Sequence, residues 1–239
     1  LADVWAVVRG QLSGDPVSSP FATIIWQLRM PRALLAVLVG AGLSIGGAGM
    51  QTLVRNPLAE PYLLGISSGA SVGATAVLVF GVLAQFGVYS LSAGALLGAL
   101  GAAGAVFGVS QAQGGLTPLR MVLSGVVLSS AFSAVASFMV FLSDDNHAAT
   151  SVMFWMLGSV AGASWEKLLL PLLAVAVVGT AMLAVSSWLD ALAAGPETAA
   201  ALGVRVGAMR VGLFIGLGVL IGCLVAVSGG IGFVGLIVP

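Results

Sequence analysis

Few side chains in this sequence could carry out covalent chemistry. The strongest candidate is Ser67, in the stretch GISSG over residues 65–69, which matches the G-x-S-x-G pattern around the nucleophile of many hydrolases. That chemistry needs a histidine base and a turn between a strand and a helix, and the one histidine is His147. Ser67 opens an apolar run that favours a helix, and three apolar runs separate it from His147. The two residues are therefore expected on opposite sides of a membrane, and a hydrolase is not predicted.

Nucleotide and metal chemistry are not predicted either. The sequence has no G-x-x-x-x-G-K-[ST] phosphate loop, and its one lysine, Lys167, follows an acidic residue. A single histidine excludes the usual multi-histidine metal sites, so His147 is expected in a solvated loop. The one cysteine, Cys223, excludes an internal disulfide and is expected to be a buried thiol. We predict no catalytic residue, no metal site and no cofactor, and hence a protein that is not an enzyme.

The composition points to a membrane protein. Hydrophobic residues make up 59% of the 239 residues and charged residues only 7%, with a mean hydropathy of +1.16. A soluble domain carries about 25% charged residues, so this surface must be solvated by lipid. The 34 glycines suit membrane helices that pack closely. The net charge of zero gives no sign of a nucleic-acid partner.

The apolar residues form long runs separated by short polar breaks. Complete runs lie at about 33–54, 62–83, 91–109, 119–142, 165–188 and 210–228, and another begins near 231. Each has about the ~20 residues that a bilayer needs. We therefore predict an all-α, polytopic, tightly packed helix bundle with about six complete spans. Residues 1–28 are predicted to be a surface segment with a short amphipathic helix around Val4–Leu12 and an interfacial Trp26.

Two of the breaks are long enough to hold structure of their own. Residues 143–164 predict a surface loop and then a short helix at the membrane interface, with Trp155 and Trp165 as anchors. Residues 189–209 predict two short helices outside the membrane, because Gly195-Pro196 splits the segment and Gly203 closes it. Glycines four residues apart in several runs predict faces on which helices approach closely.

The spans lack the charges that ion-coupled carriers use. No ionisable Asp, Glu, Lys, Arg or His occurs in 33–54 or from 62 to 119, although proton- and sodium-coupled carriers usually keep such groups near the midplane. This favours a passive pore or a permease driven by a partner. The positive-inside tendency leaves the orientation open, because each side of the predicted topology carries four basic residues.

Several short motifs, in their order, resemble FecCD-type permeases, the membrane subunits of ABC importers for iron-siderophores, haem and cobalamin. They are RMPR at 29–32, RNPLAEP at 55–61 followed by LG at 64–65, SGA at 68–70, WMLGS at 155–159 and GFVGLIVP at 232–239. The similarity covers nearly the whole chain. It implies a ten-span fold of which this chain is a fragment, truncated at both ends, forming a single permease domain over 1–239.

The resemblance also implies an assembly and an orientation. Family members work as a permease pair, a homodimer or two close paralogues, with two ATP-binding subunits inside and a substrate-binding protein outside, in the cytoplasmic (inner) membrane of a prokaryote. Arg29 and Arg32 would then lie outside and dock the binding protein; headgroup anchoring is the alternative for them. The segment 189–209 would be the cytoplasmic coupling segment, and within it Glu197, Leu202 and Gly203 would contact the ATPase. Its Gly195-Pro196-Glu197 departs from the family's usual Gly-Glu-Glu.

Two further regions acquire expected roles from the resemblance. The cytoplasmic elbow is formed by Arg55, Asn56, Pro57, Glu60 and Pro61, and Asn56 is expected to be a turn residue. The inner gate corresponds weakly to residues 110–118, with Gly114, Gly115 and Thr117. The expected cargo is a ferric siderophore, with haem or cobalamin as alternatives within the family and a passive channel as the alternative from another class.

Overall fold

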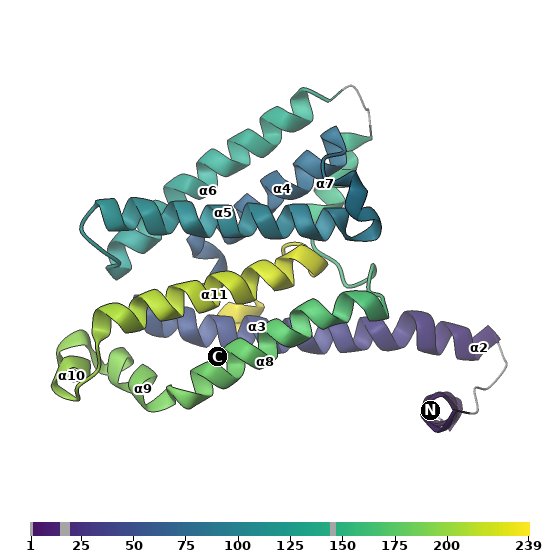
Figure 1. Ribbon diagram of the computed structural model, residues 1–239, viewed down its shortest axis with the longest axis horizontal. Coiled ribbons are helices and arrows are strands. Elements are labelled where there is room, and N and C mark those ends of the chain that lie inside the picture. Colours follow the sequence, from purple (N-terminus) through teal and green to yellow (C-terminus); the bar gives the residue numbers. More distant parts are fainter. Residues whose placement is uncertain (1, 15–19, 144–146) are drawn as a thin grey trace.

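The computed structural model describes residues 2–14, 20–143 and 147–239, and within these ranges the chain is helical, without strands. The main helices in Figure 1 are α3 (Met30–Val54), α4 (Ile66–Phe80), α5 (Ser90–Ala112), α6 (Pro118–Phe141), α8 (Leu169–Ala184) and α11 (Val206–Ser228). The short α-helices are α1 (Ala2–Ser13), α2 (Pro20–Thr23), α7 (Ala148–Met156), α9 (Ser186–Ala194), α10 (Pro196–Ala201) and α12 (Val234–Ile237). Three 3₁₀ helices cover Pro61–Leu64, Ala84–Tyr89 and Trp165–Leu168, and a π-helical turn covers Ile24–Arg29.

Five helical stretches are long and apolar enough to cross a membrane, one fewer than the sequence predicts. The missing one is the run at 62–83, which forms a 3₁₀ turn and then α4, a helix of only 15 residues. At 1.5 Å per residue α4 is about 22 Å long, short of the roughly 30 Å hydrocarbon core. Gly65 and Gly81, both with positive φ, bound this helix. Apolar content alone therefore overestimated the length of this span.

The first span begins earlier than predicted. The separate helix near the N-terminus is confirmed as α1, but residues 21–28 continue into α3 as one helical stretch, Phe21–Val54. Pro31 would clash with a carbonyl one turn before it in a regular α-helix. The π-helical turn over Ile24–Arg29 lies just before this proline and adds the extra residue that lets the helix continue. The prediction that 1–28 is entirely a surface segment is therefore wrong for 21–28.

Close helix packing is confirmed where α4 crosses α5. A Cβ added to Gly73 would overlap the carbonyl oxygen of Gly94, and one added to Gly98 would overlap that of Gly69. Only glycine at these four positions lets the two backbones approach this closely. The glycines lie four apart on each helix, which puts each pair on one face.

Helix α11 is the centre of the bundle. It packs against α3, α5 and α8, and its Phe214, Leu220 and Ile221 are buried. Gly46 of α3 lies directly against the Ile221 side chain. Cys223, on the same helix, is buried as predicted. Figure 1 shows α11 between the upper layer of α4, α5 and α6 and the lower layer of α3 and α8.

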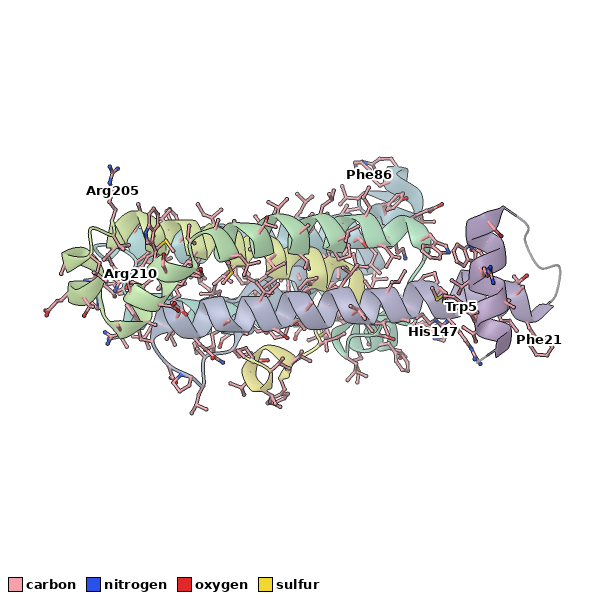
Figure 2. The ribbon with its side chains drawn as sticks, turned by 90° about the horizontal axis from the view of Figure 1, so that it is seen from below. Trp5, Phe21, Phe86, His147, Arg205 and Arg210 are labelled. Carbon is pink, nitrogen blue, oxygen red and sulfur yellow. The ribbon has the colours of Figure 1, made fainter. Side chains whose placement is uncertain are left out.

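The bundle has two distinct ends, shown at the right and left of Figure 2. We call the right one the tryptophan end; it holds Trp5, Phe86 and His147. The left one is the short-helix end; it holds α9, α10, Arg205 and Arg210. Residues 144–146 of the predicted loop lie outside the described ranges.

Candidate functional site

Arg29 and Arg32 lie together at the tryptophan end but in different environments. Both side chains are exposed. Arg32 donates a hydrogen bond from Nε to the carbonyl oxygen of Ala161, at 3.1 Å. No ion pair joins either arginine to a carboxylate of the described residues. Arg29 is therefore the more available of the two for an external partner, and Arg32 also holds the loop that contains Ala161.

The same loop is fixed by a pair of tryptophans. The rings of Trp26 and Trp165 are 4.8 Å apart between centroids, and the indole Nε1 of Trp165 donates to the carbonyl oxygen of Trp26 at 3.0 Å. Sequence analysis assigned Trp165 to the membrane interface. In the structure its indole also joins the start of α8 to the first span.

The elbow is only partly exposed. Arg55 ends α3 in the left-handed region, with φ 57°, and the Asn56 side chain accepts a hydrogen bond from the backbone N–H of Leu58 at 2.9 Å. Asn56 is thus a turn residue, as predicted. Glu60 is half-buried and Pro61 is buried. The exposed part of the elbow is therefore Arg55, Asn56 and Pro57.

The buried part of the elbow holds the C-terminal segment, which we define as residues 229–239. A carboxylate oxygen of Glu60 accepts the backbone N–H of Phe233 at 2.7 Å, and the Tyr62 hydroxyl donates to the carbonyl oxygen of Ile231 at 3.0 Å. Burial raises the pKa of the Tyr62 phenol, against a smaller opposite effect of that hydrogen bond, so the hydroxyl stays protonated as a donor. Sequence analysis missed Tyr62 and the pairing of Glu60.

The bond from Glu60 stabilises an unfavourable backbone conformation. Phe233 has φ 67°, in the left-handed region that costs a residue with a Cβ about 1–2 kcal/mol. A hydrogen bond to a charged group contributes about 1.5–3 kcal/mol, and less here because this bond is exposed to solvent. The carboxylate therefore offsets part of the strain at Phe233. The 65% exposure of the Phe233 side chain gives little packing energy to do so instead.

The short helices α9 and α10 form the predicted pair and carry the predicted coupling residues on their surface. Pro196 begins α10, and Gly203, with φ 82°, follows its C-cap, which confirms the boundaries read from the sequence. The pair has a small core of its own, made by Ala191, Ala199 and Val204. Glu197, Leu202 and Gly203 are exposed, and Leu202 is 69% accessible.

The predicted gate region is a tight turn between α5 and α6. Gly114 and Gly115 have φ values of 101° and 107°, and the Thr117 side chain accepts the backbone N–H of Arg120 at the start of α6, at 3.4 Å. Arg210 of α11 donates from Nη1 to the carbonyl oxygen of Leu116 at 3.4 Å. Sequence analysis did not connect Arg210 to this turn, because 94 residues separate it from Leu116.

A cavity of about 530 Å³ opens between α4, α6 and α7. Its wall is rich in hydroxyl groups and also includes Tyr62 and the methionines of α7; the serines are Ser67, Ser68, Ser71, Ser129, Ser133 and Ser137. The last three are spaced by four residues and therefore share one face of α6. Sequence analysis missed this wall, although that spacing was a visible signal. None of the lining residues carries a formal charge.

The surroundings of Ser67 in the cavity bear on whether it could act as a nucleophile. Ser67 lies on a helix and not on a strand-to-helix turn, and His147 is not among the lining residues. Helix α7, which starts right after His147, packs against α4 and lines the cavity; its position at the membrane interface stays a prediction. The cavity wall is thus uncharged and largely apolar, with serine hydroxyl groups from α4 and α6, and the arrangement gives no support to a serine nucleophile.

Comparisons with known proteins agree on the family. The molybdate import system permease protein MolB of Haemophilus influenzae is 36% identical over 236 residues, covering 99% of this chain and 68% of that protein. The vitamin B12 import system permease protein BtuC of Vibrio cholerae is 39% identical over 235 residues, covering 95% of this chain and 70% of that protein. The chain thus spans about two thirds of the length of the curated relatives that it matches. Molybdate was not among the cargoes expected from the sequence.

A solved structure of a metal-chelate type ABC transporter in an inward-facing conformation matches with a TM-score of 0.83 and 36% identity, covering 93% of this chain and 70% of that one. The model of the FecCD transport family matches residues 1–239. Motifs, fold and relatives therefore agree: this multi-pass membrane protein belongs to the FecCD transport family of ABC importer permeases.

Proposed function

We propose that this chain is the permease domain of an ATP-driven importer in the cytoplasmic membrane of a prokaryote, and that it moves a ferric siderophore inward. It works as a pair of permease subunits with two ATP-binding subunits and an external binding protein. The observation that carries this proposal is the presence of two separate exposed regions, one at each end of the bundle, together with an uncharged cavity whose largely apolar wall carries six serines.

At the tryptophan end, Arg29 and Arg32 dock the binding protein. Both are exposed cations on the helical stretch Phe21–Val54, and no carboxylate of the described residues pairs with them. A partner with acidic residues would supply such pairs, and charge pairs at the rim of an interface mainly steer and orient the partner. Because Arg32 already bonds Ala161, Arg29 is expected to contribute more to docking.

At the short-helix end, the coupling segment 189–209 contacts the ATP-binding subunit through Glu197, Leu202 and Gly203. A largely exposed leucine beside a carboxylate suits a partner groove that is apolar with a polar rim. The small core under α9 and α10 lets the pair move as a unit. Gly114, Gly115 and Thr117 then form the inner gate, and Arg210 links that turn to α11.

The serine wall supports a cargo that passes without tight binding. Hydroxyl groups can accept and donate hydrogen bonds but hold no net charge, so a large polar complex meets no deep electrostatic minimum. The metal-chelate description of the matching structure supports a ferric chelate as cargo. Molybdate and vitamin B12, the cargoes in the names of two relatives, are the alternatives that an uptake test must compare.

The test is ATP-dependent uptake by the full-length permease, reconstituted in liposomes with its ATPase. Ferric siderophore, haem, cobalamin and molybdate are compared side by side, each with its binding protein. Uptake of ferric siderophore that requires both ATP and binding protein is the expected result. Uptake of another cargo under the same requirements overturns the cargo alone. Leakage of small solutes without ATP would establish a passive channel and overturn the mechanism.

A further inference from the structure

A continuous series of contacts joins the two ends of the molecule through the C-terminal segment. At the tryptophan end, Arg32 bonds the carbonyl oxygen of Ala161 at 3.1 Å, and the N–H of Ala161 donates to Ser159 Oγ at 3.0 Å. The backbone N–H of Ser159 then donates to the carbonyl oxygen of Ser228 at 2.7 Å. The loop held by Arg32 is thus bonded to the last residue of α11.

The next part of the series is backbone against backbone. A Cβ on Gly229 would overlap the carbonyl oxygen of Trp155, and a Cβ on Gly158 would lie 2.9 Å from the carbonyl of Gly230. Gly229 still donates a helical hydrogen bond to Val225, but residues 230–232 form no helix, so their position depends on such contacts. Close packing on a rigid neighbour transmits small displacements, because packed interfaces do not deform continuously.

The series continues at the elbow. Ile231 is bonded by Tyr62, and Phe233 by the carboxylate of Glu60. Helix α12, in yellow in Figure 1, packs against α3 just beyond these contacts. Of the two elbow bonds, the bond to Glu60 is the one with a formal charge and the one that holds a residue with positive φ.

The far end of the series is the short-helix pair. A pocket beside the elbow is lined by Arg55 and Pro57 together with Ala193 of α9 and Pro239. The Arg55 guanidinium also approaches Gly195, where a Cβ would lie 3.7 Å from its Nη2. The elbow therefore contacts the coupling segment on one side and the C-terminal segment on the other.

We infer that Glu60 is a positioning residue that couples binding-protein docking at Arg32 to the coupling segment, by fixing residues 231–233 against the elbow. This inference rests on the proposed function. Without the carboxylate, Phe233 loses the partner of its strained N–H, and residues 232–233 are held less firmly to the elbow, with the Tyr62–Ile231 bond remaining. Docking of the binding protein would then no longer change the rate of ATP hydrolysis.

The test measures how strongly the purified binding protein stimulates ATP hydrolysis by the reconstituted full-length complex. Glu60→Leu, which removes the acceptor, is expected to lower this stimulation at least about fivefold, the lower limit of typical coupling between sites. Glu60→Gln keeps a carbonyl acceptor and should retain most of it. Tyr62→Phe should give a smaller loss. Tyr89→Phe is the matched control, because its exposed hydroxyl bonds Glu166, away from the elbow, and should behave as wild type.

A second variant separates positioning from folding. Phe233→Gly removes the cost of the left-handed backbone, so in the Glu60→Leu background it should restore part of the stimulation. Such a non-additive result is the signature of a coupled pair. Wild-type stimulation in assembled Glu60→Leu complexes, or a mere loss of assembled complex with normal stimulation per complex, overturns the inference. If the wild type imports nothing in an ATP-dependent manner, the proposed function fails first and the inference falls with it.

Discussion

Helices α11 and α6 are nearly equal in length and both apolar, yet they occupy opposite environments. In the most apolar stretch of α11, 67% of residues are buried inside the protein, against 22% in α6. Their mean hydropathies, 2.5 and 1.8, do not foretell such a difference. A helix that is apolar on all sides is accepted equally by lipid and by protein, so only its neighbours decide which it meets.

Because their burial differs, we expect α11 and α6 to have different roles. On α11, glycine and large aliphatic residues interlock with α3 and α5, as expected of a structural axis. On α6, serines four apart face the cavity while Val127 and Phe138 on the other side are exposed. Substitutions in α11 should therefore change stability, and substitutions on the serine face of α6 should change transport.

The largest effect is expected from Phe214→Ala in α11. The Phe214 ring is buried and lies 5.9 Å from the ring of Phe107, so its removal leaves a cavity in the core. The free energy of unfolding should fall by about 3 kcal/mol. Thermal unfolding of the purified permease measures this. Phe138→Ala in α6, where the ring is 60% exposed, is the control and should change stability by less than about 0.5 kcal/mol. Equal losses of unfolding free energy in Phe214→Ala and Phe138→Ala would show that the difference in burial between the two helices does not affect stability.

An intermediate effect is expected from Ser133→Leu combined with Ser137→Leu in α6. Two larger apolar side chains would narrow the cavity and remove hydroxyl groups from its wall. Uptake should fall about tenfold, equivalent to about 1.4 kcal/mol, with unchanged thermal stability. Val127→Leu, on the opposite face of the same helix, should leave uptake as in wild type. Normal uptake by the double variant would exclude the serine wall from the passage.

The smallest effect is expected at the start of α6. Thr117→Ala removes the side-chain acceptor for the N–H of Arg120, a cap of this helix. Because the bond is long, the loss of stability should be about 0.5 kcal/mol, the low end for such caps. Thr117→Ser should retain it. Helix α11 has no side-chain cap at Arg205, so Arg205→Ala should leave stability unchanged. A large transport defect in Thr117→Ser would favour a gating role for the threonine methyl group.

Features set by neighbouring residues were predictable from the sequence. Pro196 and Gly203 marked the ends of α10, and Asn56 marked a turn, because each residue type favours one local backbone conformation. The motif order identified the family. The bounds of the apolar run at 62–83 and the start of the first span were mispredicted. There the backbone changes, at Gly65, at Gly81 and in the π-helical turn before Pro31, leave hydropathy unchanged.

By itself, the sequence determined that this protein is a bundle of membrane helices with two polar ends, and where its candidate contact residues lie. Only the tertiary structure decided that α11 is central, that Arg32 holds a loop, and that Glu60 holds Phe233. The physical reason is distance along the chain. Glu60 and Phe233 are 173 residues apart, and hydropathy sums over neighbours in sequence, whereas burial and hydrogen bonding depend on neighbours in space.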